Sequence, residues 1–280
     1  MLTMTDHDTF DATDLDRCID DVRTGGHLIQ HLTNRVTMND VAQVTLHWGG
    51  LPVMADTAGD AEEMATAASA ALFNIGTASD REIDTMIAVG EVANDRGIPV
   101  VFDPVGVGAT PTRSENAERL LSAVDFAAIN GNYGEVSALA GVEAEVAGVE
   151  SIGEYEEIGD STRALAASTG ATVIASGVTD VISDGESVYE LSVGSERMGE
   201  VVGTGCLLGA TLATFNAAID DPLEASLSAT LGFGLAGERA AERSPDGPAS
   251  YRVAFLDSIA GTDPATDSDV SVTDRIERVD

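Results

Sequence analysis

The sequence predicts an α/β fold in which a mostly parallel sheet is covered by helices on both faces. Short apolar runs alternate with longer amphipathic runs over most of the chain, which is typical of parallel strands joined by crossover helices. Hydrophobic residues make up 44% of the 280 positions, enough for a sizeable core, although only 4% of positions are aromatic. The strand pattern stops after Gly203, and helical patterns follow it. A single domain is the simplest interpretation.

The first part of the chain is expected to alternate buried strands with helices that carry one polar face. The expected strands are, in order, His27–Leu32, Leu51–Met54, Leu72–Ile75, Val100–Phe102, Phe126–Ile129 and Thr172–Ala175. The expected helices are Asp40–His47, Ala61–Ala70, Ile83–Arg96, Arg113–Ala123, Glu135–Ala140 and Ser161–Ser168.

The second part is expected to begin with a hairpin and to continue with helices. Val181–Ser183 and Val188–Leu191 flank a short Asp-Gly turn, which is typical of two antiparallel strands at a sheet edge. The helices expected beyond it are Cys206–Ile219, Pro222–Arg243 and Tyr251–Ile259, and proline suits the first turn of a helix.

The domain is expected to span residues 15–262, with loosely attached ends. Residues 1–14 are acidic and lack the basic start and apolar stretch of a signal peptide, so a flexible N-terminus is predicted. Residues 263–280 are acidic and poor in large apolar groups, which indicates a disordered or loosely docked tail.

The charge of the chain excludes several classes of partner. There are 48 acidic and 14 basic residues, the net charge is -34, and every basic residue is Arg. Such a surface repels nucleic acid and anionic lipid. Acidic residues spread over the whole length are typical of a salt-adapted cytoplasmic protein. No apolar run reaches the ~18 residues that a membrane span needs. We therefore expect a soluble cytoplasmic protein that binds neither nucleic acid nor membrane.

The glycine-rich turn Gly203–Cys206 is the most informative motif. Its glycines allow close approach of a ligand to the backbone, and the helix that follows directs free N–H groups and a positive dipole end at one point. Such an anion hole suits a phosphoryl group in transfer. Cys206 lies at this helix end, where the pKa of a thiol tends to fall. The alternative for the glycine-rich turn is a plain tight connection. The alternative for Cys206 is a small buried apolar residue without a chemical role.

Two further motifs follow neighbouring predicted strands. Asp103 begins the glycine-rich run Asp103–Thr110, and Asn132 and Glu135 follow the next strand. Ligands bind beyond the carboxyl ends of parallel strands, and carboxylate and amide oxygens suit Mg²⁺. For Asn132 and Glu135 the alternative is a helix cap with Glu three residues on.

Six motifs together resemble those of the hydroxyethylthiazole kinase family over roughly residues 15 to 260. They are Leu32–Asn39 (I-T-N-x-V-x-M-N in the family), Pro52–Ala55 (P-V-M-A), Leu72–Thr77 (L-x-x-N-I-G-T), Asp103–Thr110 (D-P-V-G-x-G-A-T), Gly203–Cys206 (G-T-G-C) and Ala236–Glu238 (A-G-E). The resemblance implies a ribokinase-like three-layer α/β/α fold and a homotrimer with sites between subunits. It also implies ATP- and Mg²⁺-dependent phosphorylation of 4-methyl-5-(2-hydroxyethyl)thiazole, a thiamine salvage step.

The resemblance also implies a role for each matching residue. The residues implied in catalysis are Gly203, Thr204, Gly205 and Cys206. Those implied in thiazole binding are Met54, Asn34, Asn39 and Gly203, and those implied in ATP binding are Asn130, Asn132 and Ser176. Those implied in metal binding are Asp103 and Glu135. Whether Cys206 accepts the proton of the alcohol or only shapes the anion hole stays open.

Three positions depart from the family pattern near the expected nucleotide. Asn130 stands where Arg is common, Val178 where Glu is usual, and Glu200 where Lys is frequent. Salt adaptation would account for these exchanges if potassium, Arg113 or Arg119 supplies the positive charge. The alternatives are a non-catalytic thiazole-binding or regulatory protein with a drifted ATP site, and a kinase of a related small alcohol.

Overall fold

A nine-stranded sheet forms the centre of the computed structural model, which describes residues 10–141, 158–262 and 272–280. Six strands are parallel, in the spatial order β2-β1-β3-β4-β5-β6. They are β1 (Leu28–Leu32), β2 (Leu51–Val53), β3 (Ala70–Asn74), β4 (Val100–Asp103), β5 (Ala128–Asn132) and β6 (Thr172–Ser176). The antiparallel strands β7 (Asp180–Ser183), β8 (Val188–Leu191) and β9 (Ile276–Arg278) extend the sheet beyond β6.

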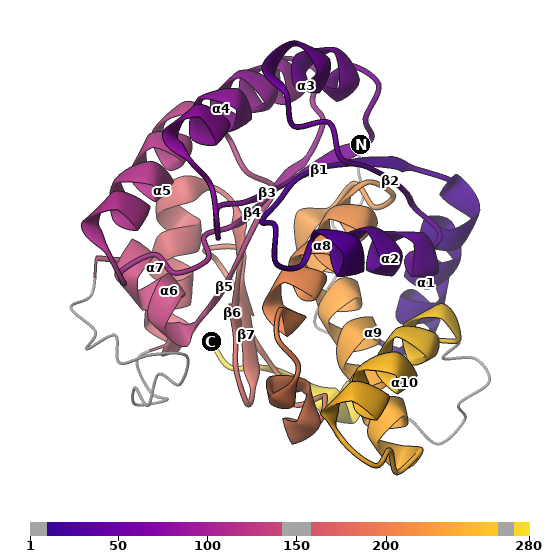
Figure 1. Ribbon diagram of the computed structural model, residues 1–280. Helices are drawn as coiled ribbons and strands as arrows, with labels where there is room; N and C mark the ends of the chain where they lie inside the picture. Colours follow the sequence, from indigo (N-terminus) through magenta and orange to yellow (C-terminus); the bar gives the residue numbers. More distant parts are fainter. Residues whose placement is uncertain (1–9, 142–157, 263–271) are drawn as a thin grey trace, which may run out of the picture.

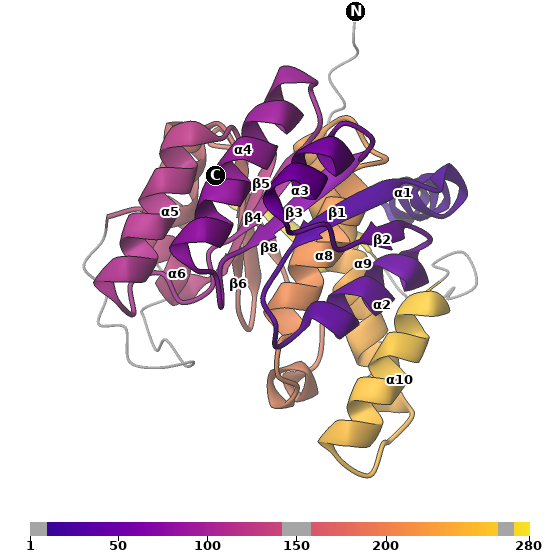
Figure 2. The ribbon, with the colours of Figure 1, turned by 45° about the horizontal axis from the view of Figure 1, so that its top comes forward.

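Helices cover both faces of the sheet, so the predicted three-layer architecture is confirmed (Figures 1 and 2). One layer holds α1 (Ala12–Gly25), α2 (Met38–Trp48), α8 (Thr204–Asn216), α9 (Pro222–Glu242) and α10 (Pro248–Ala260). The other holds α3 (Ala58–Ala65), α4 (Asp80–Asp95), α5 (Pro111–Ala123), α6 (Tyr133–Leu139) and α7 (Ile158–Thr169). Each layer has its own apolar core, because successive strand residues face opposite sides of a sheet. In β3, Leu72 belongs to the first core and Phe73 to the second.

Helix α8 fixes the position of the glycine-rich turn. It packs against β3, β4 and β5, and every residue from Cys206 to Asn216 is buried. A helix that is apolar all round belongs inside a protein. Its N-terminus therefore lies at a defined place beside the carboxyl ends of the central strands.

The N-terminal boundary differs from the expectation. Helix α1 begins at Ala12, and the Asp11 carboxylate caps it by accepting bonds from the N–H groups of Thr13 and Asp14. Phe10 is buried in the first core. The acidic composition predicted a flexible segment, but the acidic residues cap this helix and form its solvent-exposed face. The predicted flexibility of residues 1–9 lies outside the described residues.

The C-terminal tail also differs from the expectation. Residues 273–275 form the 3₁₀ turn η5, and β9 then pairs with β8. Arg275 makes a two-point ion pair with Glu238, with N–O distances of 2.6 and 3.1 Å. Strand pairing uses backbone groups, so a segment with few apolar side chains can still join a sheet. The prediction for residues 263–271 lies outside the described residues.

The boundary between α3 and β3 was also predicted wrongly. Helix α3 ends at Ala65, and Ala70 is the first residue of β3 rather than the last of the helix. Ala70 is fully buried in the sheet, where burial outweighs the helix preference of alanine.

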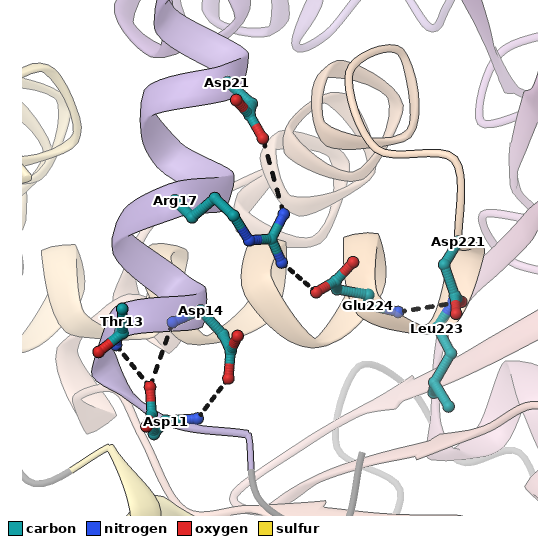
Figure 3. A network of polar contacts seen from close by, with 8 residues as sticks. All are labelled: Asp11, Thr13, Asp14, Arg17, Asp21, Asp221, Leu223 and Glu224. Carbon is teal, nitrogen blue, oxygen red and sulfur yellow. Dashed lines mark hydrogen bonds and ion pairs between the residues drawn. The ribbon is translucent and has the colours of Figure 1, made fainter. Parts of the chain in front are cut away.

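A polar network fastens α1 to α9 (Figure 3). Arg17 of α1 pairs with Glu224 in the first turn of α9 and lies 3.6 Å from Asp21. Glu224 is 7% exposed, and Asp221 caps its helix by accepting a bond from the N–H of Leu223 at 2.9 Å. Arg17 therefore compensates a buried carboxylate.

Among the helices that the structure describes, none combines the length and apolar character of a membrane span.

Candidate active site

Polar residues lie at the carboxyl ends of the parallel strands. Asn74 ends β3 beside Asp103 at the end of β4, and Asn132 ends β5 beside Ser176 at the end of β6. Asn34 follows β1 at the same edge. The predicted site residues at the strand ends are therefore brought together where ligands of open α/β sheets bind.

A buried hydrogen-bond network joins three strand ends to helix α8. The Asn34 amide donates to Thr37 Oγ1 at 2.9 Å, to Asn74 Oδ1 at 3.0 Å and to Cys206 Sγ at 3.4 Å. The Asn74 amide donates to Asp103 Oδ2, and the Cys206 thiol also hydrogen-bonds to Asp103. Asn34 and Cys206 thus belong to one network, which adds Thr37 and Asn74 to the predicted residues.

Burial governs the protonation of the two acids in this network. It raises the pKa of Asp103 well above its ordinary value, and the nearby Glu135 carboxylate raises it further. Burial also raises the pKa of Cys206 to about 12, with the Asp103 charge acting in the same direction. The expectation of a lowered thiol pKa at this helix end is wrong, because burial removes the water that would stabilise a thiolate. Cys206 is a neutral thiol at neutral pH.

The N-terminus of α8 presents free backbone N–H groups. Gly203 is its N-cap, with a φ of 88°, and a Cβ there would lie 2.2 Å from the Thr37 methyl group. The N–H groups of Thr204, Gly205 and Cys206 find no acceptor within the described ranges, whereas the N–H of Leu207 bonds to the Gly203 carbonyl at 3.0 Å. Three donors and the positive dipole end therefore point the same way, as an anion site requires.

The turn is open on its outer side and anchored on its inner side. A Cβ at Gly205 would meet nothing within 4 Å. The Thr204 hydroxyl lies 2.8 Å from the carbonyl oxygens of both Met198 and Val201, so it ties the turn to η3 (Glu196–Glu200). From the sheet, Asn130 Nδ2 donates to the Gly205 carbonyl at 3.0 Å. The open side leaves room for a phosphoryl group.

Glu135 is a helix cap that also holds a loop of the site. Its Oε2 accepts a bond from the Asn132 N–H at 2.9 Å, and Asn132 Oδ1 accepts one from the Glu135 N–H, so the helix cap given as the alternative is present. Its Oε1 accepts a bond from Gly106 at 2.6 Å. The Glu135 carboxylate therefore caps helix α6 and also lies close to Asp103, so the structural and the functional interpretation both apply to it.

The two carboxylates fit a hydrated Mg²⁺. Asp103 and Glu135 are close enough for their charges to disfavour each other, which a divalent cation between them would relieve. The described part of the chain contains no cluster of three or more His, Cys, Asp or Glu side chains that could hold a metal ion. Mg²⁺ commonly binds through one or two carboxylates plus water and substrate phosphates, so two carboxylates suffice.

The two arginines considered for phosphate binding lie in different places. Arg113 donates to the carbonyl of Val105 at 2.5 Å and to that of Gly76 at 3.0 Å, so it fastens together the loops after β4 and β3. Its charge also lowers the pKa of Glu135, although burial raises that pKa overall. Arg119 instead pairs with Asp84 on α4. Of the two, only Arg113, in the first turn of α5, contacts the loops of the site.

Other predicted residues lie outside the network. Met54 follows β2 and is half-buried against the first core, and Asn39 is exposed in the first turn of α2. Ser176 Oγ donates to the Gly131 carbonyl at 3.3 Å. Val178 is 88% exposed, but Asp180 accepts a bond from the Gly177 N–H close by, and burial raises the pKa of Asp180 to about 7. Sequence reasoning did not single out this carboxylate, which lies directly before the expected edge strand Val181–Ser183.

The chain is similar to hydroxyethylthiazole kinases over nearly its whole length. The model of the hydroxyethylthiazole kinase family matches residues 19–263. A hydroxyethylthiazole kinase of Natronomonas pharaonis is 48% identical over 271 residues, which are 96% of this chain and 96% of that protein. One of Haloquadratum walsbyi is 49% identical over 255 residues, which are 90% of this chain and 88% of that protein.

Solved structures agree with this similarity. The structure of a hydroxyethylthiazole kinase protein from Pyrococcus horikoshii has a TM-score of 0.85 and 33% sequence identity, covering 96% of this chain and 100% of that chain. A ribokinase-like superfamily protein from Enterococcus faecalis has a TM-score of 0.62 at 12% identity, covering 90% of this chain and 95% of that chain, and so shares the fold.

Proposed function

Because this chain belongs to the hydroxyethylthiazole kinase family, we propose that it transfers the γ-phosphoryl group of ATP to the side-chain hydroxyl of 4-methyl-5-(2-hydroxyethyl)thiazole. The observation that carries the proposal is the set of free N–H groups from Thr204 to Cys206, beside the carboxylates at the strand ends. The product would enter thiamine salvage.

The proposed chemistry is an in-line displacement at phosphorus. The thiazole hydroxyl attacks the γ-phosphorus, the bond to the β,γ-bridging oxygen breaks, ADP leaves, and the hydroxyl proton is released. The N–H groups of Thr204, Gly205 and Cys206 donate to the equatorial oxygens as their charge develops. Since Cys206 is a neutral thiol, we assign it to shaping the hole rather than to taking the proton.

Two further groups of residues would hold the nucleotide and the metal. Asp103 and Glu135 would hold Mg²⁺, partly through water, and the bound ion would neutralise charge on the triphosphate. Asn132 and Ser176, paired at the ends of β5 and β6, would lie along the ATP phosphates.

The thiazole site is proposed to be completed by a second subunit of a homotrimer. Asn34 and Gly203 lie at the catalytic network, whereas Met54 and Asn39 lie toward the β2 edge of the sheet. Exposed apolar side chains on the elements at this edge are Leu46 of α2, Leu51 of β2 and Val253 of α10. Exposed leucines on a chain of net charge -34 support burial against another copy.

A direct assay tests the proposed function. Purified protein is incubated with ATP and hydroxyethylthiazole in molar KCl, with and without Mg²⁺, and the thiazole phosphate is measured by mass spectrometry. We expect turnover that disappears when Mg²⁺ is chelated. A folded protein that binds thiazole without turnover would contradict the kinase proposal and favour a non-catalytic binding protein. Faster turnover of another small alcohol would contradict the thiazole assignment.

A further inference from the structure

Asn130 is a buried polar residue at the centre of the sheet, on the face that α8 covers. It lies in the middle of β5, is 1% exposed, and is flanked in the strand by the fully buried Ile129 and, two residues back, by Ala128. Its Nδ2 donates to the Gly205 carbonyl, and its Oδ1 has no donor among the residues that the structure describes. A buried oxygen without a partner costs about 1–3 kcal/mol, so folding stability does not explain an asparagine here.

The hydrogen bond from Asn130 fixes one peptide unit of the anion hole. The peptide that joins Gly205 to Cys206 is trans, like all peptide bonds in the described ranges, so its carbonyl and its N–H point in opposite directions. In a helix the carbonyl points toward the C-terminal end and the N–H toward the N-terminal end, and the bond from Asn130 holds this peptide in that orientation from the sheet side. A hydrogen bond to the carbonyl also polarises the peptide and strengthens its N–H as a donor.

Few other groups could hold this peptide in place. Gly203 and Gly205 have no side chains, and the Thr204 hydroxyl anchors the other end of the turn on Met198 and Val201. Helix bonding directs the Gly205 carbonyl along α8 but does not tie it to the sheet. Asn130 is therefore the link between the turn and the strand that leads to Asn132 and Glu135.

We propose that Asn130 is a positioning residue, whose amide holds the Gly205–Cys206 peptide so that the N–H groups of α8 converge on the phosphoryl group in transfer. This role rests on the proposed kinase function. Because the side chain is buried beneath the turn, it acts on the transition state through the peptide and not by binding ground-state ATP. Its loss therefore lowers kcat and leaves the KM for ATP nearly unchanged.

The test replaces Asn130 by residues that cannot donate. Asn130→Leu is close in size and removes the unpaired oxygen, and Asn130→Ala is the smaller second variant. We expect kcat to fall about 10- to 100-fold with the KM values for ATP and thiazole within about 2-fold, since small misplacements of catalytic donors have effects of this size. The melting temperature of Asn130→Leu should be unchanged or higher. Asn216→Leu, which removes a buried amide at the far end of α8, is the matched control and should keep its kcat.

Calorimetric binding provides a readout that a purely structural role would not move. ADP with aluminium fluoride mimics the phosphoryl group in flight. Asn130→Leu should weaken its binding by about the same factor as kcat, with ADP alone unaffected. If the wild type is active, two results would overturn the positioning role and leave the kinase function intact. One is an unchanged kcat in both Asn130 variants, and the other is a raised KM for ATP at constant kcat. A wild type without turnover would remove the proposed function and this role with it.

Discussion

The close approach of Gly203 to Thr37 gives the sharpest test of the anion hole. In Gly203→Ala the new Cβ would lie 2.2 Å from the Thr37 methyl carbon, far inside the contact distance of about 3.5–4.0 Å for two carbons. The backbone φ of 88° adds a left-handed conformation that costs alanine about 1–2 kcal/mol. Relief of the overlap should cost about 1–3 kcal/mol more.

The consequence for the enzyme follows from where the strain is released. Helix α8 is buried from Cys206 onward and cannot move there, so its less buried first turn must shift and carry the N–H groups of Thr204 and Gly205 with it. We expect kcat to fall at least about 100-fold. Denaturant unfolding should show a loss of about 2–5 kcal/mol, the sum of the two costs. Gly199→Ala in η3, where a Cβ meets nothing within 4 Å, is the matched control and should change neither quantity.

A double variant separates the two sources of strain. Thr37→Ser removes the methyl group that the new Cβ would meet but keeps the hydroxyl to which Asn34 donates. Gly203→Ala in the Thr37→Ser background should therefore recover the overlap cost and retain the left-handed cost. Equal losses in both backgrounds, after correction for Thr37→Ser alone, would refute the steric explanation. Full activity of Gly203→Ala would refute the assigned geometry of the hole.

Three further predictions concern the surroundings of the site. Arg17→Met should destabilise the fold by about 1–3 kcal/mol in denaturant titrations, because Glu224 stays buried without its partner, and adding Glu224→Gln should recover part of the loss. Asp180→Asn should match the wild-type melting temperature near pH 4 and exceed it increasingly up to about pH 7. The pKa of Asp180 is raised in the folded state, so the folded protein keeps this proton to a higher pH than the unfolded chain does, and the stability of the wild type falls between about pH 4 and pH 7. Melting temperatures of the two proteins that change in parallel with pH would contradict this prediction. Leu51→Asp should convert the proposed trimer to single chains in light scattering, whereas Val279→Asp near the opposite edge should not; a trimer that survives Leu51→Asp would contradict the proposed interface.

The sequence predicted the features of the site that depend on local pattern. Asp103 and Asn132 follow apolar runs, so their place at the carboxyl edge followed from strand order alone. The anion hole was predicted because glycines precede an apolar helical run at Gly203. Asn74 could also have been found, since it ends a buried strand next to the strand that carries Asp103.

Features that depend on how distant segments dock could not be predicted in this way. The hydrogen bond from Asn130 to Gly205 joins residues 75 positions apart, and no periodicity in the sequence predicts such a contact. The pKa of Cys206 depends on burial by other segments, which overrides the helix-end preference. β9 has a single half-buried apolar residue, Ile276, so only its pairing with β8 reveals it as a strand.

The burial of α8 has a consequence for how this protein should lose activity on heating. In many enzymes the functional groups stand on loops that open before the rest of the fold melts. Here the donors of the anion hole belong to the helix that fills one core, between the sheet and α9. Inactivation and global melting should then coincide, and improvements in core packing should extend the working temperature range directly.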